Sequence, residues 1–198
     1  MAEVRLIREG WWRWIERGVR FDVTCTSTYI EDGNHRVVVD VGNAGEEETY
    51  LAALEAANVD RLKVDVVVLT HFHPDHNGLL HLFPNAEYVS SSSRWKGSIH
   101  ARWEDEALPI TDDVYVLKMA GHSDFDCAVV ANTPSGVVTM SGDLWVRSPS
   151  DPRLTTFIDR NAVEDSRRRI IGLSSWIVPG HGPMGASSEA VAELPETP

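Results

Sequence analysis

The sequence predicts a layered α/β fold in which a polar site lies where strands end. Residues 64–70 are mostly β-branched and apolar, which is typical of a strand buried on both faces. Directly after them come three histidines and an aspartate, and then a short apolar stretch typical of a helix. Because sites in layered α/β folds usually lie where a strand gives way to a helix, this segment is the predicted functional centre.

Further strands and helices are predicted on both sides of this segment. Periodicity and turn signals favour strands at 4–7, 21–30, 35–41, 87–90, 114–119, 127–131, 137–140 and 176–178. Residues 46–58 and 159–173 have the apolar spacing of surface helices. Residues 91–111 show no clear pattern. Residues 167–169 are expected on the solvated face of the second of these helices, and the chain beyond residue 186 is expected to form a short helix or a frayed end.

Composition limits the class of protein. The 198 residues predict one domain over residues 1–198, with 42% hydrophobic residues. No apolar run approaches the roughly 20 residues of a membrane helix, and the mixed charges of the first residues do not resemble a signal peptide, so we expect a cytoplasmic protein. The net charge of −12 argues weakly against binding of polyanions but does not exclude a nuclease, since metal ions can supply local positive charge.

The spacing of the polar residues predicts metal binding. His71 and His73 are two positions apart, so on an extended backbone both can reach one ion at about 2.0–2.1 Å. Pro74 turns the chain, and Asp75 and His76 can then reach a second ion, roughly 3.5–4 Å from the first. The alternative is a helix capped by Asp75 with solvated histidines, but one strand end rarely needs three histidines for structure.

The sequence HFHPDH at 71–76 resembles the H-x-H-x-D-H signature of the metallo-β-lactamase superfamily. The other motifs of that family appear in the same order, and the resemblance spans residues 24–183. They are Asp40 before Val41-Gly42, then Gly121-His122-Ser123, Ser141-Gly142-Asp143 and Gly180-His181-Gly182.

This resemblance implies a four-layer αββα sandwich, two mixed sheets with helices outside and the metals at one sheet edge. It implies a first ion held by His71, His73 and His122, and a second ion held by Asp75, His76 and His181. Asp143 would bridge both ions, and Asp40 would support a ligand histidine. Two divalent ions are expected, most simply zinc, although iron or manganese also suits nitrogen and oxygen ligands.

The same resemblance implies a dinuclear hydrolase in which a metal-bridging hydroxide, oriented by the catalytic residue Asp75, attacks the substrate. An ester, thioester or lactone-type small molecule is the favoured substrate, and no cysteine stands at the position of Asp143 as it does in some true β-lactamases. A metal-dependent phosphodiesterase or nuclease stays open. So does a mononuclear iron persulfide dioxygenase, which iron content and oxygen consumption would reveal.

Three tryptophans lie between Gly10 and Gly18 and predict a loop with large apolar side chains: Trp11, Trp12 and Trp14. In the family that this sequence resembles, the loop between the first strands lies over the metal site, which suggests contact with substrate. Packing in the core or a contact in a homodimer are the alternatives.

Overall fold

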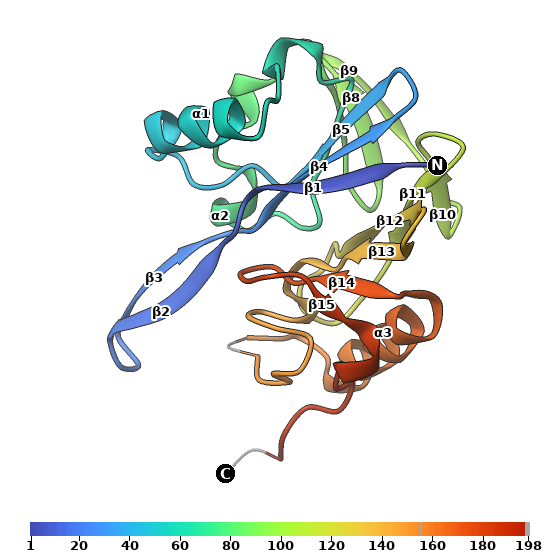
Figure 1. Cartoon of the computed structure of the whole chain (residues 1–198). Coiled ribbons are helices and arrows are strands. Elements are labelled where there is room, and N and C mark those ends of the chain that lie inside the picture. The colour runs from blue at the N-terminus through green and yellow to red at the C-terminus, as the bar shows by residue number, and fades with distance from the viewer. Residues whose placement is uncertain (155, 197–198) are drawn as a thin grey trace.

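The computed structural model describes residues 1–154 and 156–196, which form two sheets packed face to face (Figure 1). In spatial order, the first sheet contains β1 (Glu3–Arg8), β4 (Ser27–Asp32), β5 (His35–Val39), β6 (Val66–Val68), β7 (Glu87–Val89), β8 (Ser93–Lys96) and β9 (Ile99–Arg102). The second contains β10 (Ala107–Pro109), β11 (Val114–Lys118), β12 (Cys127–Thr133), β13 (Gly136–Met140), β14 (Trp176–Val178) and β15 (Gly185–Ala186). Strand β6 runs parallel to β5 and β7, and β13 runs parallel to β14, so both sheets are mixed.

Alternating side chains of the strands create the layers. Val37 and Val39 of β5 enter the core between the sheets, whereas Val38 enters a second core with Tyr50 and Leu54. Tyr50 and Leu54 belong to α1 (Glu47–Ala56), which covers the outer face of the first sheet (Figure 1). The expected helix at 46–58 is therefore present.

The second sheet repeats this arrangement. Val129 of β12 faces the core between the sheets, and Val130 packs with Val163 and Ile170. These belong to α3 (Arg160–Leu173), whose first turn is capped by Asp159, which accepts a hydrogen bond from the Ala162 N–H. A helix, two sheets and a helix thus follow one another, and the predicted αββα sandwich is confirmed.

Short helices complete the connections. They are α2 (Pro74–Asn77) and the 3-10 turns η1 (Arg61–Lys63), η2 (Leu80–Leu82), η3 (Gly142–Leu144) and η4 (Ser187–Glu189). Within residues 1–154 and 156–196, no helix is both long and apolar enough to cross a membrane.

The expectation for the aromatic loop was wrong. Residues 11–24 form a two-stranded hairpin, β2 (Trp11–Glu16) and β3 (Arg20–Thr24), which projects from the body of the molecule (Figure 1). The strand expected at 21–30 divides after Thr24, because the Thr26 N–H donates to Gly180 O (2.6 Å) instead of a strand partner. Gly10 makes this crossing possible, since a Cβ there would overlap the Cys25 backbone.

Two further expectations differ from the structure. Residues 91–111 contain the strands β8, β9 and β10, of which β9 and β10 lie at sheet edges. The exposed β9 lacks the alternation that marks a half-buried strand. Arg167 is buried, not solvated, because its guanidinium reaches carbonyl groups beneath α3.

Candidate metal centre

The polar residues identified in the sequence lie at one end of the two sheets. Asp40 and His71 follow β5 and β6, which are parallel neighbours in the first sheet. Asp143 and His181 follow β13 and β14, which are parallel neighbours in the second sheet. Since carboxyl ends of parallel strands meet at one sheet edge, the topology brings together residues that are distant in sequence. His122 follows β11 and joins them.

The first group of side chains is His71, His73, His122 and Asp143. Each offers one potential ligand atom, and these atoms all lie within 4.8 Å of one another. His73 Nδ1 is 2.9 Å from His71 Nε2 and 3.2 Å from His122 Nε2. Nitrogen ligands at tetrahedral positions around one zinc ion would be roughly 3.3–3.4 Å apart. The spacing of the group therefore fits one ion.

The second group is Asp75, His76 and His181, whose ligand atoms also lie within 4.8 Å of one another. The Nε2 atoms of His76 and His181 are 3.4 Å apart. Asp75 Oδ2 is 3.6 Å from His76 Nε2 and 3.5 Å from His181 Nε2. Asp143 reaches both groups. Its Oδ1 is 3.1 Å from His181 Nε2, and its Oδ2 is 3.5 Å from His122 Nε2.

Hydrogen bonds on the far side of the rings determine which nitrogen faces the cluster. Carbonyl and carboxylate oxygens only accept hydrogen bonds, so a ring nitrogen that contacts one carries the hydrogen. These contacts join His76 Nδ1 to Asp40 Oδ2 (2.8 Å), His181 Nδ1 to Thr24 O (2.8 Å) and His122 Nδ1 to Thr156 O (3.0 Å). With Nδ1 bonded on that side, each of these three rings turns its Nε2 atom into the cluster, where in the neutral form the Nε2 lone pair can bind a metal.

Asp40 orients two of the histidines. Its carboxylate accepts hydrogen bonds from the Thr70 N–H (2.9 Å), the Thr70 hydroxyl (2.8 Å) and the His76 ring. The Thr70 hydroxyl, having donated to Asp40, accepts from His71 Nδ1 at 3.1 Å. Asp40 has a φ of 56°, a left-handed conformation that aspartate tolerates better than most residues. The structure thus places Asp40 behind the cluster.

Burial and neighbouring charge set the pKa values of the rings. Burial holds the pKa of His71 well below its usual value, and burial followed by His122 lowers the pKa of His73. Burial also opposes protonation of His76, but the carboxylates of Asp40 and Asp143 outweigh it and raise the pKa of His76 well above its usual value. His71 and His73 therefore offer neutral rings, which are the form that binds metal.

The surroundings of the Asp143 carboxylate show whether the histidines and aspartates of the cluster fit a metal ion. Burial tends to raise the pKa of Asp143, but His181 and His76 outweigh it and hold that pKa well below its usual value. Its buried Oδ1 has no hydrogen-bond partner among the described residues, although two Nε2 atoms lie nearby. Lone pairs that face a buried carboxylate are unfavourable unless a cation lies between them. Cations such as zinc fit this set of nitrogen and oxygen donors.

Sequence reasoning missed Asp126, which holds the turn that carries His122. Its carboxylate accepts hydrogen bonds from the His122 N–H (2.8 Å), the Ser123 N–H (2.9 Å) and the Ser123 hydroxyl (2.5 Å). Burial raises the pKa of Asp126, and the hydrogen bonds from Ser123 oppose that shift. An aspartate four residues after a candidate ligand was the signal that could have identified it.

Thr26 performs a similar role for His181. Its hydroxyl accepts from the Gly182 N–H and donates to Gly182 O, both at 2.9 Å. Gly180 must be glycine, because a Cβ there would overlap Asp143 Oδ1. Gly121 has a φ of 120° and lies against Val163, which matches the sharp turn expected before His122.

A cavity of about 360 Å³ opens onto the cluster. One side of it, here called the ligand wall, includes His73, Asp75, Asp143 and His181. The other side, here called the hairpin wall, consists of Trp12, Trp14, Phe21 and Val23. Two of the three tryptophans singled out in the sequence therefore lie at the candidate site, whereas Trp11 is not among the residues that line the cavity.

A larger cavity of about 560 Å³ lies elsewhere, between α1 and the first sheet. Its charged side chains pair with one another, as in the contacts of Glu31 with Arg5 and Arg36 and of Asp60 with Lys63. It contains none of the candidate metal ligands, so the smaller cavity is the candidate active site.

Comparisons with known proteins agree with this geometry. Residues 20–108 match the model of the metallo-beta-lactamase superfamily. Metallo-beta-lactamase domain-containing protein 1 of Xenopus laevis is 31% identical over 164 residues, which cover 79% of this chain and 70% of that protein. This chain belongs to the metallo-β-lactamase superfamily. The family resemblance inferred from the motifs is thereby confirmed.

Two more members of the superfamily are similar over different extents. Hydroxyacylglutathione hydrolase of Aeromonas salmonicida is 37% identical over 101 residues, 48% of this chain and 37% of that enzyme. The structure of a putative metallo-beta-lactamase from Thermotoga maritima superposes with a TM-score of 0.72 at 17% identity, covering 93% of this chain and 99% of that one. The second comparison establishes the fold, and the first covers little more than a third of its relative.

Proposed function

We propose that the protein is a metal-dependent hydrolase that cleaves an ester, thioester or lactone-type small molecule. The observation that carries this proposal is the buried cluster of histidines and aspartates, with Asp143 between its two groups. His71, His73 and His122 would hold one divalent ion, Asp75, His76 and His181 would hold a second, and Asp143 would contact both. When bound, such ions supply Lewis acidity and lower the pKa of water so that it attacks near neutral pH.

The chain itself contributes orientation and proton transfer. Asp75 lines the cavity, and its side chain is partly exposed, unlike the buried His76 and His181. Its carboxylate can accept a hydrogen bond from the attacking water and pass the proton to the leaving group. Asp40 and Asp126 hold His76 and His122 in place, so the cluster needs little rearrangement when the substrate arrives.

Three observations favour carboxylic over phosphodiester chemistry. The name of the Aeromonas relative describes a hydrolase of a hydroxyacyl compound of glutathione. The described residues that line the cavity include no lysine or arginine, the side chains that most often contact a nucleic-acid backbone. The net charge of −12 points the same way.

The test is metal content per chain in protein purified without added metal, followed by assays on a simple lactone, a thioester and bis-p-nitrophenyl phosphate. Close to two zinc ions with turnover of the lactone or thioester is the expected result. Turnover of the phosphodiester alone would replace the proposal with a phosphodiesterase. About one iron per chain with oxygen consumption and no hydrolysis would replace it with a dioxygenase.

A further inference from the structure

The cavity at the cluster has one polar side and one apolar side. Its hairpin wall brings Trp12, Trp14 and Phe21 together, and Trp12 stacks on Phe21 with ring centroids 5.5 Å apart. Trp14 meets Trp12 edge-on at 4.7 Å. Trp12 is only 8% exposed, whereas Trp14 and Phe21 remain 44% and 52% exposed. Aromatic surface exposed beside a reactive cluster indicates a binding site for an apolar group.

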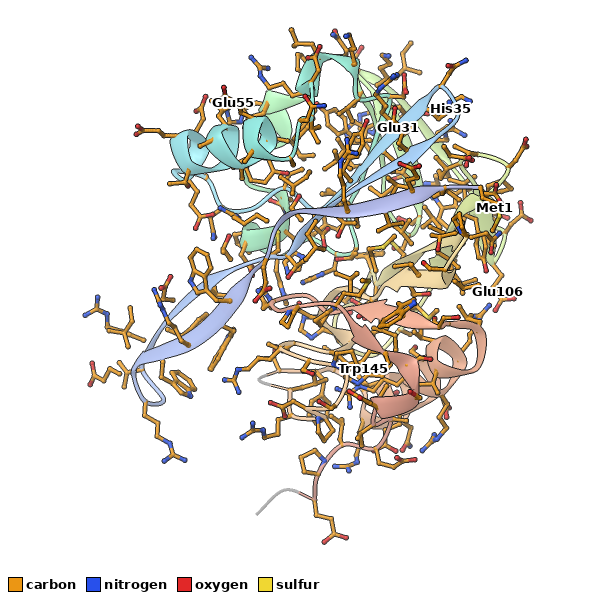
Figure 2. The ribbon with its side chains drawn as sticks, in the orientation of Figure 1. Met1, Glu31, His35, Glu55, Glu106 and Trp145 are labelled. Atoms are coloured by element: carbon orange, nitrogen blue, oxygen red, sulfur yellow. The ribbon has the colours of Figure 1, made fainter. Side chains whose placement is uncertain are left out.

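The hairpin offers these rings to the cavity instead of to the core. It projects from the body of the molecule, and its side chains stand apart from most of the other elements (Figures 1 and 2). The guanidinium of Arg147 lies 4.7 Å from the Trp12 ring, and Arg147 Nε donates to Trp12 O at 3.3 Å. This contact fixes Trp12 and leaves the outer rings, Trp14 and Phe21, free to meet a ligand.

Charge excludes several kinds of substrate from the cavity. The acidic side chains Asp75 and Asp143 are on the ligand wall, and the described lining residues include no basic side chain. Arg147 lies behind Trp12 and is also 3.7 Å from the carboxylate of Asp151, so its charge is already paired. A group with several negative charges would therefore find no partner on the hairpin wall.

Further apolar side chains lie beside the histidines of the first group. Phe72, between His71 and His73, is 46% exposed and meets the equally exposed Phe125 edge-on at 6.4 Å. Phe125 belongs to the turn that carries His122. Aromatic surface is therefore presented from the segments that carry His71, His73 and His122 as well as from the hairpin.

We propose that the hairpin wall binds the apolar acyl chain of an uncharged ester, thioester or lactone, with the bond to be cleaved at the ligand wall. This inference rests on the hydrolase function proposed above and adds the substrate class. The cavity volume of about 360 Å³ is within the range of small-molecule sites. Trp14 and Phe21 are then specificity-determining residues, because they contact the acyl chain and not the reacting atoms.

The kinetic test uses N-acetylcysteamine thioesters of acetate, butyrate, hexanoate and octanoate, which differ only in acyl length and carry no charge. With metal-loaded protein, kcat/KM should rise about fourfold per methylene, which is the expected gain from burying each one. Trp14→Ala combined with Phe21→Ala should remove most of this rise. Ile15→Ala is the matched control, since Ile15 is an exposed apolar residue of the same hairpin that does not line the cavity.

The outcomes separate this inference from the hydrolase proposal. Failure to hydrolyse any of these thioesters, together with failure to hydrolyse the lactone of the first test, would overturn the hydrolase function. Equal turnover of all four would retain that function and overturn the inference, as would a chain-length rise that survives in the double variant. A further comparison uses the octanoyl thioester of glutathione, which carries charge. If it were cleaved more than tenfold better than the octanoyl thioester of N-acetylcysteamine, the protein would recognise the charged glutathione part, and the proposal of an uncharged substrate would be overturned.

A binding measurement without turnover completes the test. Calorimetry on metal-free protein should show that 1-octanol binds more tightly than 1-butanol, again by about fourfold per methylene. The double variant should lose this difference, and Ile15→Ala should keep it. Equal binding of the two alcohols to the wild-type protein would contradict an apolar site on the hairpin wall.

Discussion

The two walls of the cavity are held in different ways. On the ligand wall, the His181 ring is fixed from behind by Thr24 O at 2.8 Å, and its side chain is almost fully buried. On the hairpin wall, Trp14 and Phe21 are about half exposed, and they contact mainly each other and Trp12. The ligand wall is therefore built for fixed geometry, and the hairpin wall is built for contact with a partner.

This difference separates chemistry from recognition. A metal centre loses affinity when its ligands shift by fractions of an ångström, so the polar contacts behind the ligand wall must be numerous and buried. A hydrophobic wall tolerates small displacements, because the hydrophobic effect has no preferred direction. Substitutions on the ligand wall should accordingly reduce metal binding, whereas those on the hairpin wall should change substrate preference and leave metal binding intact.

Removing a residue of the cluster is the change with the largest expected effect. His122→Ala and Asp143→Ala should each abolish hydrolysis and lower the metal content, because each leaves an ion with too few ligands. Metal analysis and turnover of the wild-type substrate measure both effects. His81→Ala is the control, since His81 is exposed and pairs only with Glu47. Full turnover and full metal content in either cluster variant would refute the site assignment.

Arg167 supports the ligand wall through its contact beside Asp143, and its loss should be costly for stability. It donates to Leu144 O (2.6 Å), next to Asp143, and to Pro152 O and Ala192 O, and burial lowers its pKa to about 10. Arg167→Met leaves these buried carbonyl groups without a donor, so the free energy of unfolding should fall by about 3 kcal/mol or more. Urea denaturation of metal-free protein measures it.

The neighbouring Arg168 provides the matched control for that substitution. Its side chain is 49% exposed and pairs with Glu164 and Asp165 on the surface of α3. Arg168→Met should cost less than about 1 kcal/mol, as is usual for exposed ion pairs. Similar losses in the two variants would show that burial beneath α3 gives Arg167 no special role.

Asp40→Asn is a milder change behind the ligand wall. Asparagine tolerates the left-handed backbone at this position. Its amide has only one acceptor oxygen, so it cannot replace both carboxylate oxygens, which accept hydrogen bonds from Thr70 and His76. Metal affinity should fall by about 10- to 100-fold, the usual effect of losing a residue that orients a ligand. Competition with a chelating indicator measures it, with Asp60→Asn as the exposed control. Unchanged affinity would mean that Asp40 does not orient His76.

Strong local signals predicted a layered α/β fold and the polar segment at 71–76, whereas the αββα sandwich and the other members of the cluster came from the resemblance to the metallo-β-lactamase superfamily. Residues 64–70 could only be a buried strand, and the histidines that follow it had few structural roles to play. The same reasoning failed for Arg167, since its place in a helix with polar neighbours resembles a solvated face. Its burial depends on the carbonyl groups of Pro152 and Ala192, which tertiary packing brings beneath α3.

The hairpin was misread for a related reason. Trp11, Trp12 and Trp14 lie close together and lack the alternation of a half-buried strand, because β2 is mostly exposed. The break after Thr24 depends on the contact of Thr26 with the loop of His181, which is more than 150 positions away in sequence. Asp126 was missed because the N–H and hydroxyl groups that donate to it belong to a turn whose shape the sequence does not specify.

The smallest expected effect on stability comes from the hairpin wall, and it provides the sharpest contrast between two tryptophans. Trp145, labelled in Figure 2, is fully buried near α3 and donates to Val191 O at 3.0 Å, so Trp145→Ala should lower the free energy of unfolding by about 3–5 kcal/mol. Trp14→Ala should lower it by less than about 1 kcal/mol and leave metal content unchanged, because Trp14 is half exposed and lies on a projecting hairpin. Thermal or urea unfolding of the two variants makes the comparison. If Trp14→Ala were as destabilising as Trp145→Ala, the hairpin would be part of the core, and its aromatic side chains would have a structural role instead of a role in binding substrate.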